Sequence, residues 1–319
     1  MPVFQGGTNL FRDLEQRLPQ LLAPRRRELP FESGVFVPTK PDLAPGSYEV
    51  VKTVINDVGS ATILGDGAFD FPVVDASASE DRYRNLMAVA GFTIGYQTSR
   101  REAYAASIDT LRVSQYDMKM QTCIRAIQER RNRIAAIGDA TIGATGLLNN
   151  ANIVADNNSF NPYLATADDL IDFFISQVES FYTNSNNVFF PTTALVSDQL
   201  DFKMIRSRVP NSELTVKEYI QNALKKRGLG FKIEGVKEAG FAQLEAAGVL
   251  TPGTNKDRIV LYPLDPEVVE RHVEMIQMAP LQYLQVQGLN TLYPMFGCMT
   301  PTIINYTNAI SYIDVIKKP

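Results

Sequence analysis

One stretch of helical pattern constrains this fold more than any other feature of the sequence. Ser99 and Glu102 form a capping box, in which hydroxyl and carboxylate satisfy exposed backbone donors, and Gly138 can end the helix. An unbroken helix of roughly forty residues would span about 60 Å, which is longer than a compact domain of this size needs. The stretch 114–117 is a candidate interruption. The apolar stripe consists of Tyr104, Ile108, Leu111, Ile124, Ile127, Ile134 and Ile137.

Positive charge is concentrated on this stretch, although the whole chain is acidic. With 31 basic and 35 acidic residues the net charge is −4, so bulk electrostatics does not predict a nucleic-acid binder. Residues 98–137 nevertheless carry eight basic and four acidic side chains, a local excess of +4. Contact with nucleic acid and a salt-bridged surface are equal alternatives, because Asp and Glu are interleaved. The candidate residues are Arg25, Arg26, Arg27, Arg130, Arg131 and Arg133.

The first 45 residues predict an extended arm. Asn9 is a good N-cap for an amphipathic segment that Pro19 would kink or end. The apolar positions of that segment are Leu10, Phe11, Leu14, Leu18, Leu21 and Leu22. Prolines then recur as far as Pro45 and prevent regular β-ladders. We expect a strap that lies on another surface.

Residues 46–78 predict a long β-hairpin. Residues 48–55 are rich in β-branched side chains, 56–60 supply turn chemistry, and 61–64 resume the strand. Few large apolar residues are present, and a two-stranded ribbon alone is marginal in water. We therefore expect residues 1–78 to have no core of their own, and the hairpin to need another surface, such as a neighbouring chain.

After Gly138 the pattern alternates between helices and strands. Thr166 is predicted to cap a helix whose buried face is Leu170, Phe173, Phe174, Val178 and Phe181. A second capping box joins Thr215 to Glu218 and opens a helix that stops at Gly228. The expected strands are 188–196, 231–236, 258–262, 289–293, 302–306 and 312–316, with 86–97 before the long helix. Residues 266–275 are predicted to form a short helix.

No catalytic or metal-binding constellation is evident. His272 is the single histidine, and Cys123 and Cys298 are far apart, so packed, reduced thiols are favoured over a bridge or a nucleophile. Gly143 to Gly146 lacks the Lys-Ser/Thr ending of a phosphate loop, and Asp66 and Asp70 lack the remaining ligands of a calcium loop. We expect no metal and no cofactor. No apolar run is long enough for a membrane span, and the N-terminus lacks signal-peptide features, so a cytosolic chain is expected.

Four strings in order carry a family resemblance. They are 92–102 (FTIGYQTSRRE), 134–139 (IAAIGD) followed by 146–153 (GLLNNANI), 258–267 (RIVLYPLDPE) and 309–314 (AISYID). From about Tyr48 to Ile316 the chain resembles the major capsid proteins of tailed bacteriophages of the Hong Kong 97 lineage. The resemblance implies an α+β Hong-Kong-97-like capsid fold with an arm, an extended loop, a spine helix, a peripheral domain and an axial domain.

The resemblance also implies a division of the chain. The arm would be 1–45, the extended loop 46–78, the peripheral domain 79–139 with 263–302, and the axial domain 140–262 with 303–319. The extended loop would lie over an adjacent subunit. Its candidate intersubunit residues are Tyr48, Val54, Ile55, Asn56, Asp57, Gly59 and Ile63. Because Lys52 is the one lysine between Gly46 and Asp81 and does not lie at the tip, no isopeptide crosslink is expected.

The implied function is that of a non-enzymatic shell protein. Copies would form pentamers and hexamers in an icosahedral head around non-specifically bound double-stranded DNA, with the basic residues on the inner surface. Because the hairpin begins by about Gly46, a separate scaffolding protein is expected beside portal and decoration proteins. The alternatives are an encapsulin-type nanocompartment shell, which has the same architecture, and an enzyme of the α/β class, which the missing constellation disfavours.

Overall fold

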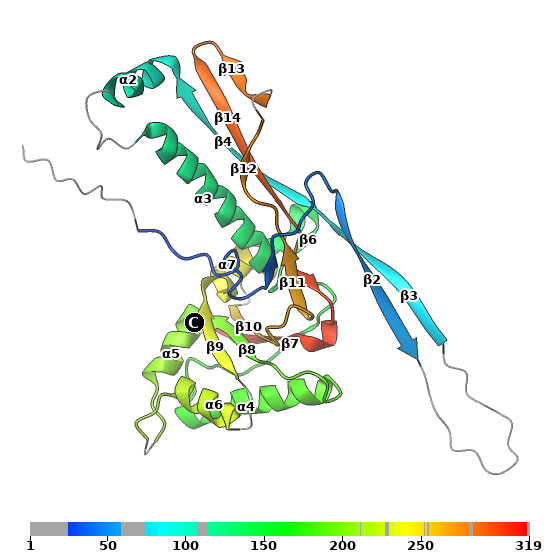
Figure 1. Cartoon of the computed structure of the whole chain (residues 1–319). Coiled ribbons are helices and arrows are strands. Elements are labelled where there is room, and N and C mark those ends of the chain that lie inside the picture. The colour runs from blue at the N-terminus through cyan, green and yellow to red at the C-terminus, as the bar shows by residue number, and fades with distance from the viewer. Residues whose placement is uncertain are drawn as a thin grey trace, which may run out of the picture.

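The computed structural model describes residues 25–58, 75–106, 114–210, 212–226, 230–251, 253, 255–280 and 283–317. A five-stranded sheet with helices lies at one end, and a long two-stranded ribbon backed by helix α3 lies at the other, while a hairpin projects to the side (Figure 1). The arrangement is a mixed α+β fold, as expected.

The five-stranded sheet is buried on both faces. Its strands, from edge to edge, are β7 (Ala155–Asn157), β16 (Ser311–Ile316), β10 (Lys256–Tyr262), β8 (Thr193–Ser197) and β9 (Lys232–Val236). Within β8 the alternation is explicit: Ala194 and Val196 join one hydrophobic cluster and Leu195 joins the other. A strand covered on both sides has a continuous apolar run, which explains why the strands of this region could be predicted from the sequence.

Helices cover this sheet, and their predicted caps are confirmed. The helices of this body are α4 (Ala167–Asn184), α5 (Asp198–Arg206), α6 (Val216–Lys225) and α7 (Phe241–Ala246), with short 3-10 turns η2 (Lys237–Ala239) and η4 (Thr307–Ala309). Capping boxes link Thr166 with Asp169 and Thr215 with Glu218. The five predicted side chains on the inner face of α4 are all buried.

The long helical stretch is interrupted at Ser114, within the predicted interruption at 114–117. Helix α2 (Tyr96–Ala106) begins before the predicted cap Ser99, so that capping box does not start a helix. Helix α3 (Gln115–Ala136) starts at Ser114, whose hydroxyl accepts from the Tyr116 amide, while the Glu102 carboxylate accepts from the Gln115 amide. Twenty-two residues give α3 a length of about 33 Å.

Gly138 ends the spine helix as predicted, and its backbone explains why. Its φ of +82° is left-handed, and an added Cβ would meet the Ala144 carbonyl oxygen at 2.2 Å. The close approach is made by a small antiparallel pair, β5 (Gly138–Asp139) and β6 (Ala144–Thr145), joined by the 3-10 turn η1 (Ala140–Ile142). A side chain at this position would therefore separate α3 from the turn that follows it.

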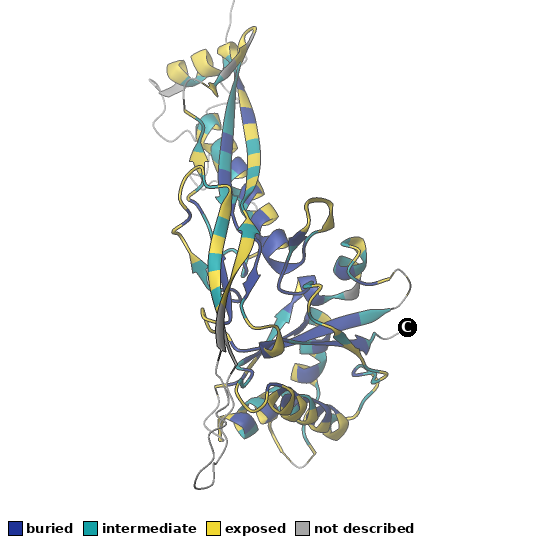
Figure 2. Cartoon of the chain, turned by 90° about the vertical axis from the view of Figure 1, so that its right-hand side faces the viewer, coloured by how far each residue is buried: buried dark blue, intermediate teal, exposed yellow. Residues whose placement is uncertain are grey.

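The two-stranded ribbon rests on the spine helix. Strand β4 (Leu86–Gly95) pairs along its whole length with β14 (Asn290–Met299), and β12 (Gln277–Met278) and β13 (Gln285–Gln287) pair with β14 as well. Phe92 stacks on Tyr293 at 5.2 Å, and Phe92 and Met295 of the ribbon share one hydrophobic cluster with Ile127 of α3. Figure 2 shows the resulting stripes of buried and exposed residues. Cys123 and Cys298 are both free thiols, as expected.

The hairpin is longer than predicted and differently paired. Strand β2 (Glu49–Val58) pairs with β3 (Asp75–Arg84), and Asn56 and Asp57 belong to β2 instead of a turn. The predicted return strand 61–64 lies outside the described residues. Residues 59–74 lie outside the described part of the chain. The hairpin projects from the body as a pair of strands, β2 and β3 (Figure 1).

The arm contributes to the core of its own subunit, which corrects the expectation for residues 1–78. Phe31, Phe36 and Val37 are buried in the larger hydrophobic cluster, and β1 (Thr39–Lys40) pairs in parallel with β11 (Val269–His272). The predicted helix at 266–275 is wrong, because β11 is a strand that also pairs with β15 (Ile303–Ile304). The amphipathic segment 10–22 lies outside the described residues.

Candidate assembly and nucleic-acid interfaces

A buried carboxylate anchors the base of the hairpin. Glu270 on β11 is 3% exposed and accepts hydrogen bonds from Lys52 of the hairpin and Lys40 of the arm. Lys52 Nζ also donates to Asn305 Oδ1 at 2.9 Å. Burial opposes ionisation of Glu270, but these two ammonium donors outweigh it and hold the pKa of the carboxyl below its usual range. The one lysine predicted in the hairpin is therefore tied to its own subunit.

The only histidine belongs to the same junction. His272 Nδ1 lies 2.6 Å from Asp42 Oδ1 of the arm, and His272 Nε2 lies 3.9 Å from Glu270 Oε2. In the pairing of β1 with β11, Lys40 is the register partner of His272. The imidazole thus joins arm and strand in a network of carboxylates and ammonium groups, with no hydroxyl or thiol nucleophile among its hydrogen-bond partners.

The opposite face of β11 carries a second buried charge cluster. Arg271 is fully buried, and its Nη2 lies 3.0 Å from Glu32 Oε2 of the arm. Arg131 of the spine helix reaches the other oxygen of Glu32 at 3.3 Å and donates to the Glu274 and Cys298 carbonyls at 2.6 and 2.8 Å. These contacts join the arm, the spine helix and the β4–β14 ribbon within one subunit.

Strand β11 therefore links the hairpin to the spine helix. Successive side chains of a strand point to opposite sides, so Glu270 meets the hairpin while Arg271 meets the spine. Asn132 strengthens the spine side, since its Oδ1 accepts from the Phe31 and Glu32 amides at 3.0 and 3.2 Å. Polar contacts of β11 consequently hold together the described part of the arm, the base of the hairpin and the spine helix.

The predicted nucleic-acid residues separate into three groups. Arg131 is 3% exposed and cannot reach a ligand on the surface, which corrects its inclusion. Arg27 pairs with Glu238 at 2.7 Å, and Arg130 pairs with Asp139, although both guanidinium groups remain partly exposed. Within the described ranges, Arg25, Arg26 and Arg133 are exposed and make no ion pair. Arg131 sits four residues after Ile127 and three before Ile134, so helical phase already places it on the buried stripe.

The predicted intersubunit residues lie on the projecting hairpin or outside the described residues. Tyr48 and Ile55 are largely exposed, at 87% and 68%, and Val54 is partly buried. Asn56 and Asp57 lie in β2, whereas Gly59 and Ile63 fall outside the described part of the chain. An exposed, paired ribbon with isoleucine and tyrosine on its surface needs a partner surface to be stable in water.

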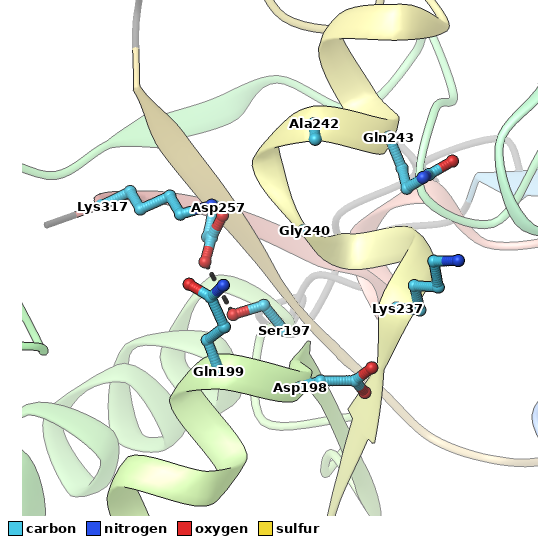
Figure 3. Close-up of a pocket in the computed structure, with 9 residues that line it drawn as sticks. All are labelled: Ser197, Asp198, Gln199, Lys237, Gly240, Ala242, Gln243, Asp257 and Lys317. Atoms are coloured by element: carbon cyan, nitrogen blue, oxygen red, sulfur yellow. Dashed lines mark hydrogen bonds between the residues drawn. The ribbon is translucent and has the colours of Figure 1, made fainter. Parts of the chain in front are cut away.

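A pocket beside the five-stranded sheet has a structural role (Figure 3). Its volume is about 200 Å³, and within it Ser197 Oγ donates to Asp257 Oδ2 at 2.7 Å. Tyr163 donates to the same carboxylate, and burial raises the pKa of its hydroxyl above the usual value. Because Ser197 also caps α5, this network fixes that helix on β10. The single histidine is at the hairpin base, so no imidazole base serves this serine.

The described ranges contain neither a candidate metal site nor a helix that could span a membrane. No group of three or more His, Cys, Asp or Glu residues there is arranged to hold a metal ion. Every helix in those ranges is too short or too polar to cross a lipid bilayer.

The chain is similar to a family of capsid proteins and to solved structures from phages and an encapsulin. A family described as major capsid protein matches residues 59–316. The capsid of Myoviridae phage XM1 superposes with a TM-score of 0.72 at 13% identity, covering 98% of this chain and 100% of that chain. The structure from Gordonia phage Cozz gives 0.61 at 12% identity, with 99% and 96% covered. An encapsulin complex from Synechococcus elongatus PCC 7942 gives 0.53 at 12% identity, with 96% and 94% covered. None of the curated proteins matches this sequence.

Proposed function

This chain belongs to the major capsid protein family, and on that premise we propose that its copies assemble as pentamers and hexamers into the icosahedral head shell that encloses phage DNA. A shell protein of the virion needs surfaces for its own copies and no catalytic centre. We accordingly propose no enzymatic activity and no cofactor, and assembly in the cytoplasm of the bacterial host without a membrane.

The β2–β3 hairpin is the observation that carries this proposal. Ten consecutive residue pairs join β2 to β3, and the side chains of Val51 and Ile55 in β2, and of Tyr48 just before it, are exposed in the subunit. Lys52 fixes the base of the ribbon to Glu270, so the hairpin is held outward by its own subunit. In the proposed shell it lies over an adjacent copy, and every subunit gives and receives this contact.

Packaged double-stranded DNA is the second proposed partner. Arg25, Arg26 and Arg133 are exposed cations without an ion pair in the described ranges, and Arg27 and Arg130 are partly exposed beside them in sequence. On the inner surface they would neutralise phosphate without reading sequence, so the contact weakens with salt. Replacing Arg25, Arg26 and Arg133 by Glu is expected to leave empty shells able to form and to lower DNA retention.

The remaining proposed partners follow from the shell. A separate scaffolding protein would contact the inner face of the shell, a portal would occupy one vertex, and decoration proteins would contact the outer face.

An encapsulin-type nanocompartment is a second candidate function, which the matching encapsulin fold favours. The fit to that shell is lower than the fit to the phage capsid, with TM-scores of 0.53 and 0.72.

Electron microscopy of the purified protein tests the function, and a deletion tests the hairpin. Closed icosahedral particles containing DNA support the proposal, whereas particles filled with a protein cargo support the encapsulin candidate.

Replacing residues 50–83 with a short glycine linker should leave a folded subunit that forms no particles, because both cores lie outside this range. Intact shells from the shortened chain would refute the role given to the hairpin.

A further inference from the structure

Two surfaces of the five-stranded sheet body are complementary and lack a partner within the described part of the subunit. The first is a groove of about 120 Å³ between α4 and α6. Its lining is almost entirely apolar, and its one charged side chain is the exposed Glu179. The lining residues are Ile175, Val178, Glu179, Tyr182, Phe190, Ala223 and Leu224. Cavities of about 150 Å³ lined by such residues hold benzene, so an open groove of this size can take a phenyl ring.

The second surface is an aromatic knob on α5. Phe202 is 70% exposed because it points away from Leu200 and Met204, which bury the other side of the helix. Arg206 lies one turn further along the same helix and is exposed. A phenyl ring this exposed is costly in water, and a cation four residues away gives the knob a positive flank.

Charge and chemistry match between the two surfaces. Neither Glu179 nor Arg206 makes an ion pair with any residue that the structure describes. The groove offers apolar walls with a carboxylate at its edge, and the knob offers a phenyl ring with a guanidinium beside it. Helix α6 contacts both α4 and α5. Groove and knob are therefore formed by neighbouring helices of the same body.

We propose that Phe202 of one copy inserts into the α4–α6 groove of the next copy around a ring, with Arg206 pairing to Glu179. A closed ring of identical subunits uses a heterologous contact, in which two different surfaces of each subunit meet. Knob and groove supply such a pair. This inference rests on the proposed shell function and specifies the lateral contact within one pentamer or hexamer.

Mutations on either side should weaken the ring while the subunit stays folded. Phe202→Ala removes the knob, and Ala223→Phe fills the groove from within. Each is expected to lower the yield of rings and shells by about tenfold or more, because one buried phenyl side chain corresponds to at least that factor in association. Leu164→Ala, a similarly exposed apolar residue of the same body, is the matched control and should assemble normally. Thermal melting checks that every variant is folded.

A charge exchange and a crosslink test the pairing directly. Glu179→Arg and Arg206→Glu should each impair assembly, and the two together should restore it, whereas Asp172→Arg on the same helix should have little effect. In a Glu179→Cys, Arg206→Cys variant, which keeps the phenyl ring of Phe202, a short bismaleimide should link subunits into covalent ladders, unlike an Asp172→Cys, Arg206→Cys control. Normal shells from Phe202→Ala, together with no ladder from the double-cysteine variant, would overturn this contact and leave the shell function standing. Covalent rings without closed particles would preserve the contact and refute the shell.

Discussion

The five-stranded sheet and strand β2 of the hairpin are both rich in β-branched residues, but they are buried very differently. Every residue of β8 is buried, whereas Val51, Thr53 and Ile55 of β2 are exposed. The sheet is covered by helices and the arm of its own subunit, and Lys52 holds the hairpin at its base. Folding of the subunit depends on the body, whereas the proposed overlap with an adjacent copy depends on the hairpin, so mutations should separate these two processes.

The largest effect on folding is expected in the body. Phe174 of α4 is buried in the core, and Phe174→Ala should lower the free energy of unfolding by about 3–5 kcal/mol through lost contacts and a cavity. Denaturant unfolding of the unassembled subunit measures this loss. Tyr48→Ala on the hairpin is the control and should change it by less than about 0.5 kcal/mol. Equal losses would remove the distinction between the regions.

A slightly smaller effect is expected at the spine. Arg131→Ala leaves the Glu32 carboxylate without one of its two guanidinium partners, and should cost about 3 kcal/mol. Arg133→Ala, two residues away on the exposed side, should cost less than about 0.5 kcal/mol. The same denaturant titration compares the two variants. If both losses are small, the arm is not held by the buried cluster.

The stability that the Glu270 ion pairs contribute at the base of the hairpin should depend on pH. Because the folded-state pKa of Glu270 is lowered, its contribution is complete above the ordinary glutamate pKa and is lost as pH falls through the lowered value. Glu270→Gln should therefore lower stability near neutral pH by about 1 kcal/mol, a modest value since Lys40 and Lys52 are partly exposed. The difference from the parent protein should shrink in acid. A difference that grows in acid would contradict this assignment.

The smallest effect on folding, and a large one on assembly, is expected at Ile55. The side chain is exposed in the subunit, so Ile55→Ser should change the free energy of unfolding by less than about 0.5 kcal/mol. The yield of shells, measured by sizing chromatography, should nevertheless fall because the partner surface loses an apolar contact. Unchanged shell yield would show that this face of the hairpin is not covered.

Sequence alone predicted the features that depend on local chemistry. The capping boxes of α4 and α6, the buried face of α4 and the end of α3 at Gly138 follow from rules that span a few residues. The family strings predicted the fold, which the family match and the similar capsid structures confirm. The ion-pairing alternative for the basic residues applies to Arg27 and Arg130, and helical phase distinguishes the buried Arg131 from Arg133.

The parts that sequence did not predict depend on distant partners. Glu270 and Arg271 look like solvated charges of a short helix, yet they are buried by contacts with Lys52 and Glu32, more than two hundred residues earlier. The arm shows the same problem, since Phe31, Phe36 and Val37 interrupt a proline-rich stretch but pack into the main core. The return strand β3 contains no Val, Ile, Leu, Met or Phe, so no hydrophobic alternation marked it as a strand.

The alternation of β11 has a consequence for which changes in chain length the protein tolerates. A shift of one residue in a strand exchanges its two faces. In β11 that shift would bring the Arg271 guanidinium toward Lys40 and Lys52 and the Glu270 carboxylate away from them, so like charges would meet at the hairpin base. Insertions or deletions of a single residue within 269–272 should therefore be excluded by electrostatics, whereas two-residue changes keep each charge on its own side.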